Sequence, residues 1–145
     1  PMPELTEAHV RETIKGFLGD QYQIPPMHSA IKIGGVPLDK MARKGEEVER
    51  KPRFIRIVSF YLLTFAPPKL TFRLHCTKGT YVRTIANDLG QKLGCGAHLS
   101  ALRRTGSGQF GIHQCSTLDE IEAMPLPEIE KRLIPVYQAA PSVAH

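Results

Sequence analysis

Cysteine is scarce in this sequence, and its three cysteines form no recognisable framework. Cys76, Cys95 and Cys115 are widely spaced and include no C-x-x-C pair. An odd number of isolated cysteines indicates packed thiols in a reducing compartment, so we expect a cytoplasmic protein. Cys95 and His98 have the spacing of half a metal site, but the sequence contains no second half, so we expect no metal here.

Long apolar runs are lacking as well. No run approaches the roughly 20 apolar residues that cross a bilayer, so we expect no membrane partner. The sequence contains no internal repeat and no low-complexity segment. It contains no nucleophile elbow either, although composition alone does not exclude a Ser/His/Asp or Cys/His hydrolase.

The composition fits one domain or part of one. The chain has 145 residues, of which 41% are hydrophobic and 23% charged, enough to bury a core. Its 19 Lys and Arg outnumber 14 Asp and Glu, for a formal net charge of +5. A basic balance favours polyanionic partners such as nucleic acid, although mildly basic cytosolic proteins often bind none.

The most informative stretch runs from Leu70 to Gly96. Apolar and polar residues alternate from Leu70 to Cys76, which predicts a half-buried strand. Lys78-Gly79-Thr80 interrupts the alternation, with Thr80 as the expected N-cap. A helical apolar stripe follows and ends at Gly94; it comprises Val82, Ile85, Ala86, Leu89 and Leu93. The pattern places Tyr81 and Arg83 in the first turn of a helix, beside a strand end.

The N-terminal half is expected to alternate helices and strands. Thr6 should cap a helix that ends at Gly19-Asp20 and buries Val10, Ile14, Phe17 and Leu18. Gly34-Gly35 should close a short hairpin, followed by a helix over residues 38–44. The charge run 46–53 is interpreted as a solvated linker.

A long strand is expected over residues 53–65, with apolar side chains on both faces. Phe54, Val58, Phe60 and Leu62 would share one face, and Ile55, Ile57 and Tyr61 the other. A turn at 66–69 should pair this strand with the next as an antiparallel hairpin.

The C-terminal third shows weaker patterns. We expect a short helix or turn at 98–104, a flexible connector at 105–108 and a strand at 109–113. Ser116 should cap a last helix over 117–124, 128–133 should add a turn, and the tail from Pro135 has no strong pattern. The overall prediction is an α+β fold, a mixed and largely antiparallel sheet flanked by helices.

Basic side chains gather beside glycine-bearing turns, where backbone can approach phosphate closely. Three groups occur: Lys32 with Lys40, Arg43 and Lys44; Lys78 with Arg83; and Arg103 with Arg104. Tyr81 offers a flat face on which a base could stack. An RNA- or DNA-facing surface is one interpretation. A core tyrosine and a surface ion pair is the other, and residue types alone do not separate them.

Five sequence blocks together are highly specific. They are Q-x-P-P-x-H-S-A-x-K from Gln23, A-R-K-G from Ala42, K-G-T-Y-V-R-T from Lys78, D-L-G with G-C-G-A-H-L from Asp88 to Leu99, and L-R-R-T-x-S-G-x-F from Leu102. Their order resembles the TruB-type pseudouridine synthases over about residues 23–118. That family isomerises the T-loop uridine of tRNA, position 55, after flipping it out of the stack, without a cofactor or metal.

The resemblance implies roles for three residues. Tyr81 would lie against the target base and help to remove the proton from its carbon. Arg83 would pair with the catalytic aspartate and hold it ionised. Leu102 would line the apolar wall of the uracil pocket, although a plain core leucine is an equally simple interpretation. RNA contacts are expected from His28, Lys32, Arg43, Lys44, Lys78, Arg103 and Arg104.

The sequence also departs from the family pattern. The family's G-x-L-D-P aspartate block and its basic-tyrosine block have no counterpart here, and Asp39 stands where a tyrosine is usual. Asp119 is followed by Glu120 and is better explained as a helix start than as a nucleophile. We therefore interpret residues 1–145 as a single, incomplete portion of a catalytic domain, without a C-terminal RNA-binding module.

The expected partners are the T-arm of tRNA and an N-terminal segment of the same enzyme. Alone, the chain should not turn over, since it offers no candidate for the aspartate. A non-catalytic RNA-binding module and a guide-RNA-dependent ribosomal RNA pseudouridine synthase subunit are the alternatives.

Overall fold

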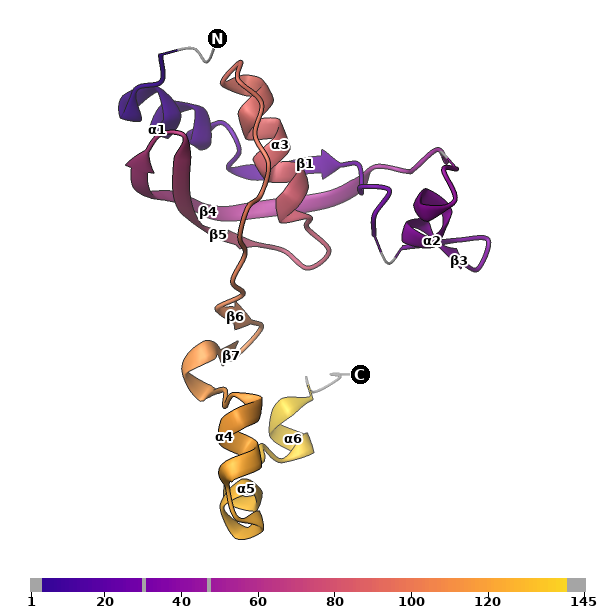
Figure 1. The fold of residues 1–145 in the computed structure, drawn as a ribbon, viewed down its shortest axis with the longest axis vertical. Coiled ribbons are helices and arrows are strands. Elements are labelled where there is room, and N and C mark those ends of the chain that lie inside the picture. The colour runs from indigo at the N-terminus through magenta and orange to yellow at the C-terminus, as the bar shows by residue number, and fades with distance from the viewer. Residues whose placement is uncertain (1–3, 30, 47, 141–145) are drawn as a thin grey trace. The chain divides into compact units, whose positions relative to one another are not determined.

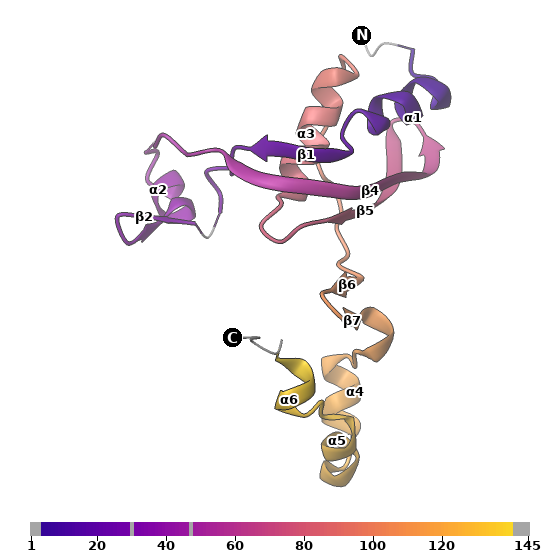
Figure 2. The same ribbon diagram turned by 180° about the vertical axis from the view of Figure 1, so that it is seen from behind.

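The computed structural model describes residues 4–29, 31–46 and 48–140, shown as ribbons in Figures 1 and 2. The chain divides into two compact units, Pro1–Ala101 and Leu102–His145, and each is described by itself. The expectation of one catalytic-domain portion across the whole chain remains a prediction. Within the described ranges, none of the helices is long and apolar enough to cross a membrane.

The first unit is built on a three-stranded sheet of order β1-β4-β5. Its strands are β1 (Gly19–Gln23), β4 (Arg53–Ala66) and β5 (Lys69–Cys76), and both pairings are antiparallel. The turn between Ala66 and Lys69 closes the β4–β5 hairpin, as expected. The α+β prediction is thereby confirmed.

The buried side chains of β4 change from odd-numbered to even-numbered positions partway along the strand, which the sequence pattern did not show. Ile55 and Ile57 are buried at odd positions, whereas Phe60 and Leu62 are buried at even positions. A register shift against β5 between Ile57 and Ser59 accounts for the change, since an extra residue turns the following side chains to the other face. The predicted division of faces is therefore wrong: all four line one core.

Helices α1 (Glu7–Lys15) and α3 (Val82–Lys92) cover the buried face of this sheet (Figure 1). The Phe17 ring meets Phe60 edge-on at 5.9 Å, and Lys92 Nζ lies 4.4 Å from the Phe17 ring centre. The apolar stripe of α3 is buried as expected through Ile85, Ala86, Leu89 and Leu93. One continuous cluster joins the helices to the strands.

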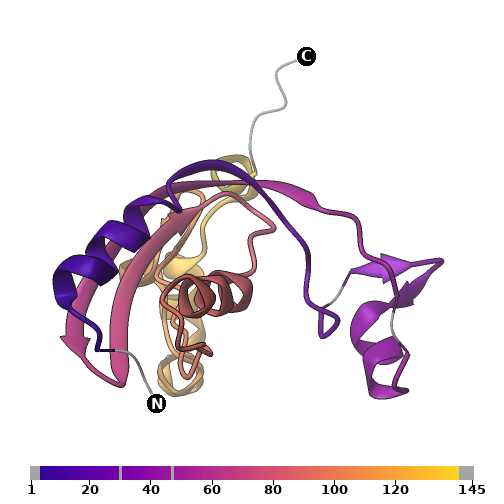
Figure 3. The same ribbon diagram turned by 90° about the horizontal axis from the view of Figure 1, so that it is seen from above.

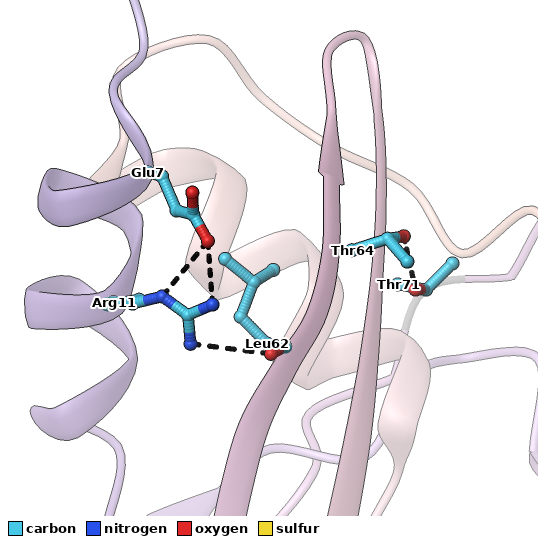
Figure 4. Close-up of polar contacts among 5 residues, drawn as sticks. All are labelled: Glu7, Arg11, Leu62, Thr64 and Thr71. Atoms are coloured by element: carbon cyan, nitrogen blue, oxygen red, sulfur yellow. Dashed lines mark hydrogen bonds and ion pairs between the residues drawn. The ribbon is translucent and has the colours of Figure 1, made fainter.

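Thr6 caps α1, as predicted, by accepting a hydrogen bond from the His9 amide at 3.2 Å. Figure 4 shows Arg11 donating to Glu7 Oε1 at 2.6 Å and to the Leu62 carbonyl of β4 at 3.4 Å. It also shows the hydroxyl pair of Thr64 and Thr71 across the hairpin. Leu18, predicted on the buried face, is 49% exposed, because α1 ends at Lys15 and the chain turns before β1.

A small substructure follows β1 and is visible beside the sheet in Figure 3. Strands β2 (Lys32–Ile33) and β3 (Val36–Pro37) form the predicted hairpin, and its two turn glycines have φ of 58° and 82°. Helix α2 (Leu38–Arg43) comes next. Leu38 is fully buried, and its amide donates to the Ile31 carbonyl at 2.7 Å, so α2 is anchored to the hairpin.

The second unit combines one small hairpin with short helices. Its elements are β6 (Gly106–Ser107), β7 (Phe110–Gly111), the 3₁₀ helix η1 (Ile112–Gln114), α4 (Leu118–Ala123), α5 (Leu126–Arg132) and α6 (Val136–Ala139). The predicted connector thus includes β6, and the strand expected at 109–113 is shorter. The helix or turn expected at 98–104 is irregular chain. Thr117, not Ser116, caps α4 by accepting from the Glu120 amide at 3.1 Å.

Candidate functional site

The site predicted from the sequence lies at the loop that connects β5 to α3. Thr77 is joined to the β4 residue Arg56, because its hydroxyl accepts from the Arg56 amide at 2.9 Å and its own amide donates to the Arg56 carbonyl at 3.0 Å. Gly79 has φ of 82°, a conformation that side chains rarely adopt. The loop between strand and helix is therefore tight and tied to the sheet.

Tyr81, rather than Thr80, is the N-cap residue of α3. Its backbone is extended, with φ −96° and ψ 108°, and Thr84 and Ile85 donate to its carbonyl. The predicted capping role of Thr80 is wrong, because its hydroxyl donates to the Thr77 carbonyl at 2.8 Å instead. The Tyr81 residue is half-buried, so it is partly packed and partly open to solvent.

The buried side chain of Gln23 holds the backbone of Tyr81. Its Nε2 donates to the Tyr81 carbonyl at 3.0 Å, and its Oε1 accepts from the Tyr81 amide at 2.7 Å. Gln23 ends β1 and is 5% exposed. No function was predicted for Gln23 from the sequence. Its place at the head of the Q-x-P-P block was the available signal.

Arg83 lies two residues beyond Tyr81 and is exposed. Its guanidinium donates to the backbone carbonyl of His28, which belongs to the segment that follows β1. A guanidinium carries five N–H donors, so one such bond leaves capacity for a carboxylate. Tyr81, Arg83 and the backbone of His28 are therefore brought together by the fold.

An open groove of about 830 Å³ runs along the segment next to this loop. Among its lining residues are Pro25, Ile31, Ile33, Leu38, Pro52, Phe54 and Gly79. Its charged lining consists of Lys32, Glu49, Arg50, Lys51, Arg53 and Lys78. Two predicted RNA-binding residues, Lys32 and Lys78, thus share one groove, although Tyr81 and Arg83 are not among the described residues that line it.

Residues 49–53 of the charge run line this groove. Glu46, Glu49, Lys51 and Arg53 are exposed, as expected of a solvated segment. Arg50 donates to the Pro25 carbonyl at 3.0 Å, which ties the run to the segment after β1. Arg53 starts β4, and its guanidinium nitrogen lies 4.0 Å from the position of a Cβ built on Gly79. These cations were not predicted from the sequence, because the run has mixed signs and no periodicity.

The remaining predicted residues occupy other places. Arg43 ends α2 and forms an ion pair of 3.5 Å with Asp39, one turn earlier, and Lys44 is the C-cap residue of the same helix. Leu102, Arg103 and Arg104 belong to the second unit, in its irregular first residues. Their site roles stay predictions.

No group of three or more His, Cys, Asp or Glu side chains that could hold a metal ion occurs among the described residues. His98 and Cys95, the half-site noted in the sequence, are both exposed.

Comparison with known proteins supplies the family. Residues 1–82 match the TruB family pseudouridylate synthase N-terminal domain, and residues 83–137 match the tRNA pseudouridylate synthase B C-terminal domain. Among solved structures, a Cbf5-Nop10-Gar1 complex aligns with a TM-score of 0.65 and 29% identity, covering 81% of this chain and 31% of that one.

Curated relatives carry the same family name. The tRNA pseudouridine synthase B of Opitutus terrae is 69% identical over 143 residues, which are 99% of this chain and 59% of that protein. That of Syntrophotalea carbinolica is 49% identical over 130 residues, 90% of this chain and 42% of that protein. The chain thus spans between two and three fifths of the length of these relatives. It belongs to the TruB family of pseudouridylate synthases.

Proposed function

We propose that these residues form part of an enzyme that isomerises a uridine of tRNA, position 55 in the T-loop, to pseudouridine. The observation that carries the proposal is the placement of Tyr81 at the N-cap and Arg83 in the first turn of α3, with the Tyr81 backbone held by Gln23. The relatives' name, tRNA pseudouridine synthase B, supports the substrate class.

Each of the three proposed catalytic residues has a distinct task. The half-buried Tyr81 ring packs against the extruded base and assists removal of the proton from its carbon. The exposed Arg83 guanidinium pairs with an aspartate supplied by another segment and keeps that carboxylate ionised. Leu102, which is 65% exposed, offers an apolar side chain against which the uracil can pack.

The groove beside this loop is proposed to carry RNA phosphates. Five of its six charged lining residues are cations, a balance that favours a polyanion. Gly79 allows the backbone to approach a phosphate closely, and the adjoining Lys78 supplies a positive charge. Arg103 and Arg104 are proposed to contact RNA from the second unit, and His28, Arg43 and Lys44 from the first.

The T-arm of tRNA is the proposed partner, and the cytoplasm the proposed location. An N-terminal segment bearing the family's G-x-L-D-P aspartate is the second proposed partner, because none of the four aspartates of this chain lies in such a block. Without that segment the chain should be inactive.

The test compares the chain alone with the chain extended by that segment, each incubated with unmodified tRNA and with tRNA lacking its T-arm. We expect pseudouridine from the extended protein on intact tRNA alone, without guide RNA. Turnover by the 145 residues alone would refute the proposed need for the segment. Equal binding of both RNAs without turnover would favour a non-catalytic RNA-binding module, and a requirement for guide RNA would favour the ribosomal RNA branch.

A further inference from the structure

One buried side chain satisfies both hydrogen-bonding groups of the Tyr81 backbone. The Gln23 carboxamide accepts from the Tyr81 amide at 2.7 Å and donates to the Tyr81 carbonyl at 3.0 Å. Such a two-bond contact is what a neighbouring β-strand would provide. Here β1 has ended at Gln23, and Pro25 and Pro26, which lack backbone N–H groups, follow.

The carboxamide that makes this contact is buried. Gln23 is 5% exposed, and a buried amide is stable only when its donors and acceptors are paired. Its partner is the N-cap residue of α3, the residue that decides where the helix begins and in which direction. The side chain therefore fixes the origin of α3 relative to the sheet.

A second contact joins the same two segments. The Arg83 guanidinium donates to the His28 carbonyl, five residues after Gln23. The residues from Gln23 to His28 thus hold both the backbone of Tyr81 and the side chain of Arg83. Loss of the Gln23 contact would leave this segment bonded to α3 at Arg83 but not at the Tyr81 backbone.

We infer that Gln23 is a positioning residue for Tyr81, and that it sets the place of the phenol at the target base through the backbone of α3. The inference rests on the proposed function for what Tyr81 does, but not for how Tyr81 is held. Displacement of a reacting group by about 1 Å can lower a rate by about 10²-fold.

The kinetic test uses the chain extended by the aspartate-bearing segment. Gln23→Ala should lower kcat about 10²-fold and leave KM for tRNA within about twofold, because the RNA-binding groove is untouched. Gln21→Ala is the matched control. Gln21 lies on the same strand, is half-buried and donates one bond of 2.7 Å to the Phe17 carbonyl, so its loss should change neither constant.

Gln23→Glu separates positioning from simple loss of packing. A carboxylate presents two acceptors and repels the Tyr81 carbonyl, whereas a protonated carboxyl has one donor and one acceptor and restores both bonds. Burial raises the pKa of such a carboxyl. We expect the ratio of variant to wild-type kcat to rise as the pH falls, while the same ratio for Gln23→Ala stays flat.

Amide hydrogen exchange on the 145-residue chain gives an answer that does not require turnover. The Tyr81 amide should exchange faster in Gln23→Ala, whereas the Leu93 amide, bonded to the Leu89 carbonyl within the last turn, should not change. If the extended wild type is active and Gln23→Ala keeps its kcat, the inference is wrong. If the extended wild type is inactive, the proposed function fails. If the exchange rate of the Tyr81 amide is the same in Gln23→Ala as in wild type, the positioning role is wrong, whether or not the enzyme is active.

Discussion

Asp20 of β1 and Arg56 of β4 face each other as Cα partners and form an ion pair on the exposed side of the sheet. The hydrogen bond from Arg56 holds the pKa of the Asp20 carboxyl below its ordinary value, and the positive charge of Arg56 adds to this effect. Two hydrogen bonds join the guanidinium to the carboxylate. The pair thus links the edge strand β1 to the central strand β4.

This ion pair predicts a pH-dependent part of the stability. Because the pKa is lower in the folded state, the contribution is present above the unfolded value of about 3.9 and is lost as the pH falls through the folded value. Asp20→Asn should therefore be less stable than wild type at neutral pH, and the difference should shrink in acid and at high salt. Thermal unfolding at several pH values measures it.

The double variant is the control for this prediction. Asp20→Asn combined with Arg56→Gln should lower the unfolding temperature no further than either change alone, since each removes the same contact. Strictly additive losses would show that the two side chains act independently.

The groove predicts a salt dependence of RNA binding. Each phosphate contact contributes a slope of roughly 0.9 for duplex or 0.7 for single strands in the plot of log affinity against log salt. Lys51 and Arg53 both line the groove. Lys51→Gln and Arg53→Gln should each reduce that slope by about the contribution of one phosphate contact and weaken binding to all tRNAs alike.

Arg73→Gln is the matched control for the groove. Arg73 is an exposed cation of β5 and is not among the lining residues. Its loss should leave the slope unchanged. A uniform effect of all three substitutions would mean that net charge, not the groove, attracts the RNA.

Gly90 predicts a packing constraint on the loop after α3. A Cβ added to Gly90 would lie 2.1 Å from the Ala97 nitrogen and 2.3 Å from the Gly96 carbonyl carbon, which are backbone atoms. Gly90→Ala should therefore destabilise the first unit by about 1–3 kcal/mol, although alanine is the better helix former by about 1 kcal/mol. Urea unfolding gives the value.

A second alanine in the same helix provides the comparison. Asn87 is exposed on α3, and Asn87→Ala should be neutral or slightly stabilising. If Gly90→Ala proved equally neutral, the close approach of the 94–97 loop to the helix would be wrong.

The bulge in β4 predicts that truncation of two adjacent side chains lowers the unfolding free energy by very different amounts. Ile57 is 1% exposed and Val58 is 53% exposed. Ile57→Ala should cost about 2–5 kcal/mol of unfolding free energy, whereas Val58→Ala should stay within about 0.5 kcal/mol. Equal costs, measured by urea unfolding, would place both side chains in the core and contradict the parity change after Ile57.

Local patterns predicted much of the first unit. Alternation located β5, helical periodicity located α3, and Thr6 located the start of α1, because each signal depends on neighbouring residues alone. The double-glycine hairpin was predicted for the same reason.

Features that depend on long-range contacts could not be predicted from the sequence. The parity of β4 depends on its register with β5, which alternation within one strand does not contain. Gln23 meets Tyr81 across 58 positions of the chain, and Arg50 meets the Pro25 carbonyl across 25. Composition and spacing do not show such contacts, so the roles of Gln23 and of the groove-lining Arg50 could be found only from the structure.

We propose that Tyr81 and Arg83 together serve the isomerisation of a tRNA uridine. The direct measurement is pseudouridine formed at position 55 by the chain extended with the aspartate-bearing segment, compared among wild type, Tyr81→Phe and Arg83→Lys. We expect pseudouridine from wild type and losses of about 10²-fold or more in both variants, with tRNA affinity nearly unchanged. Wild-type rates in both variants would contradict the account.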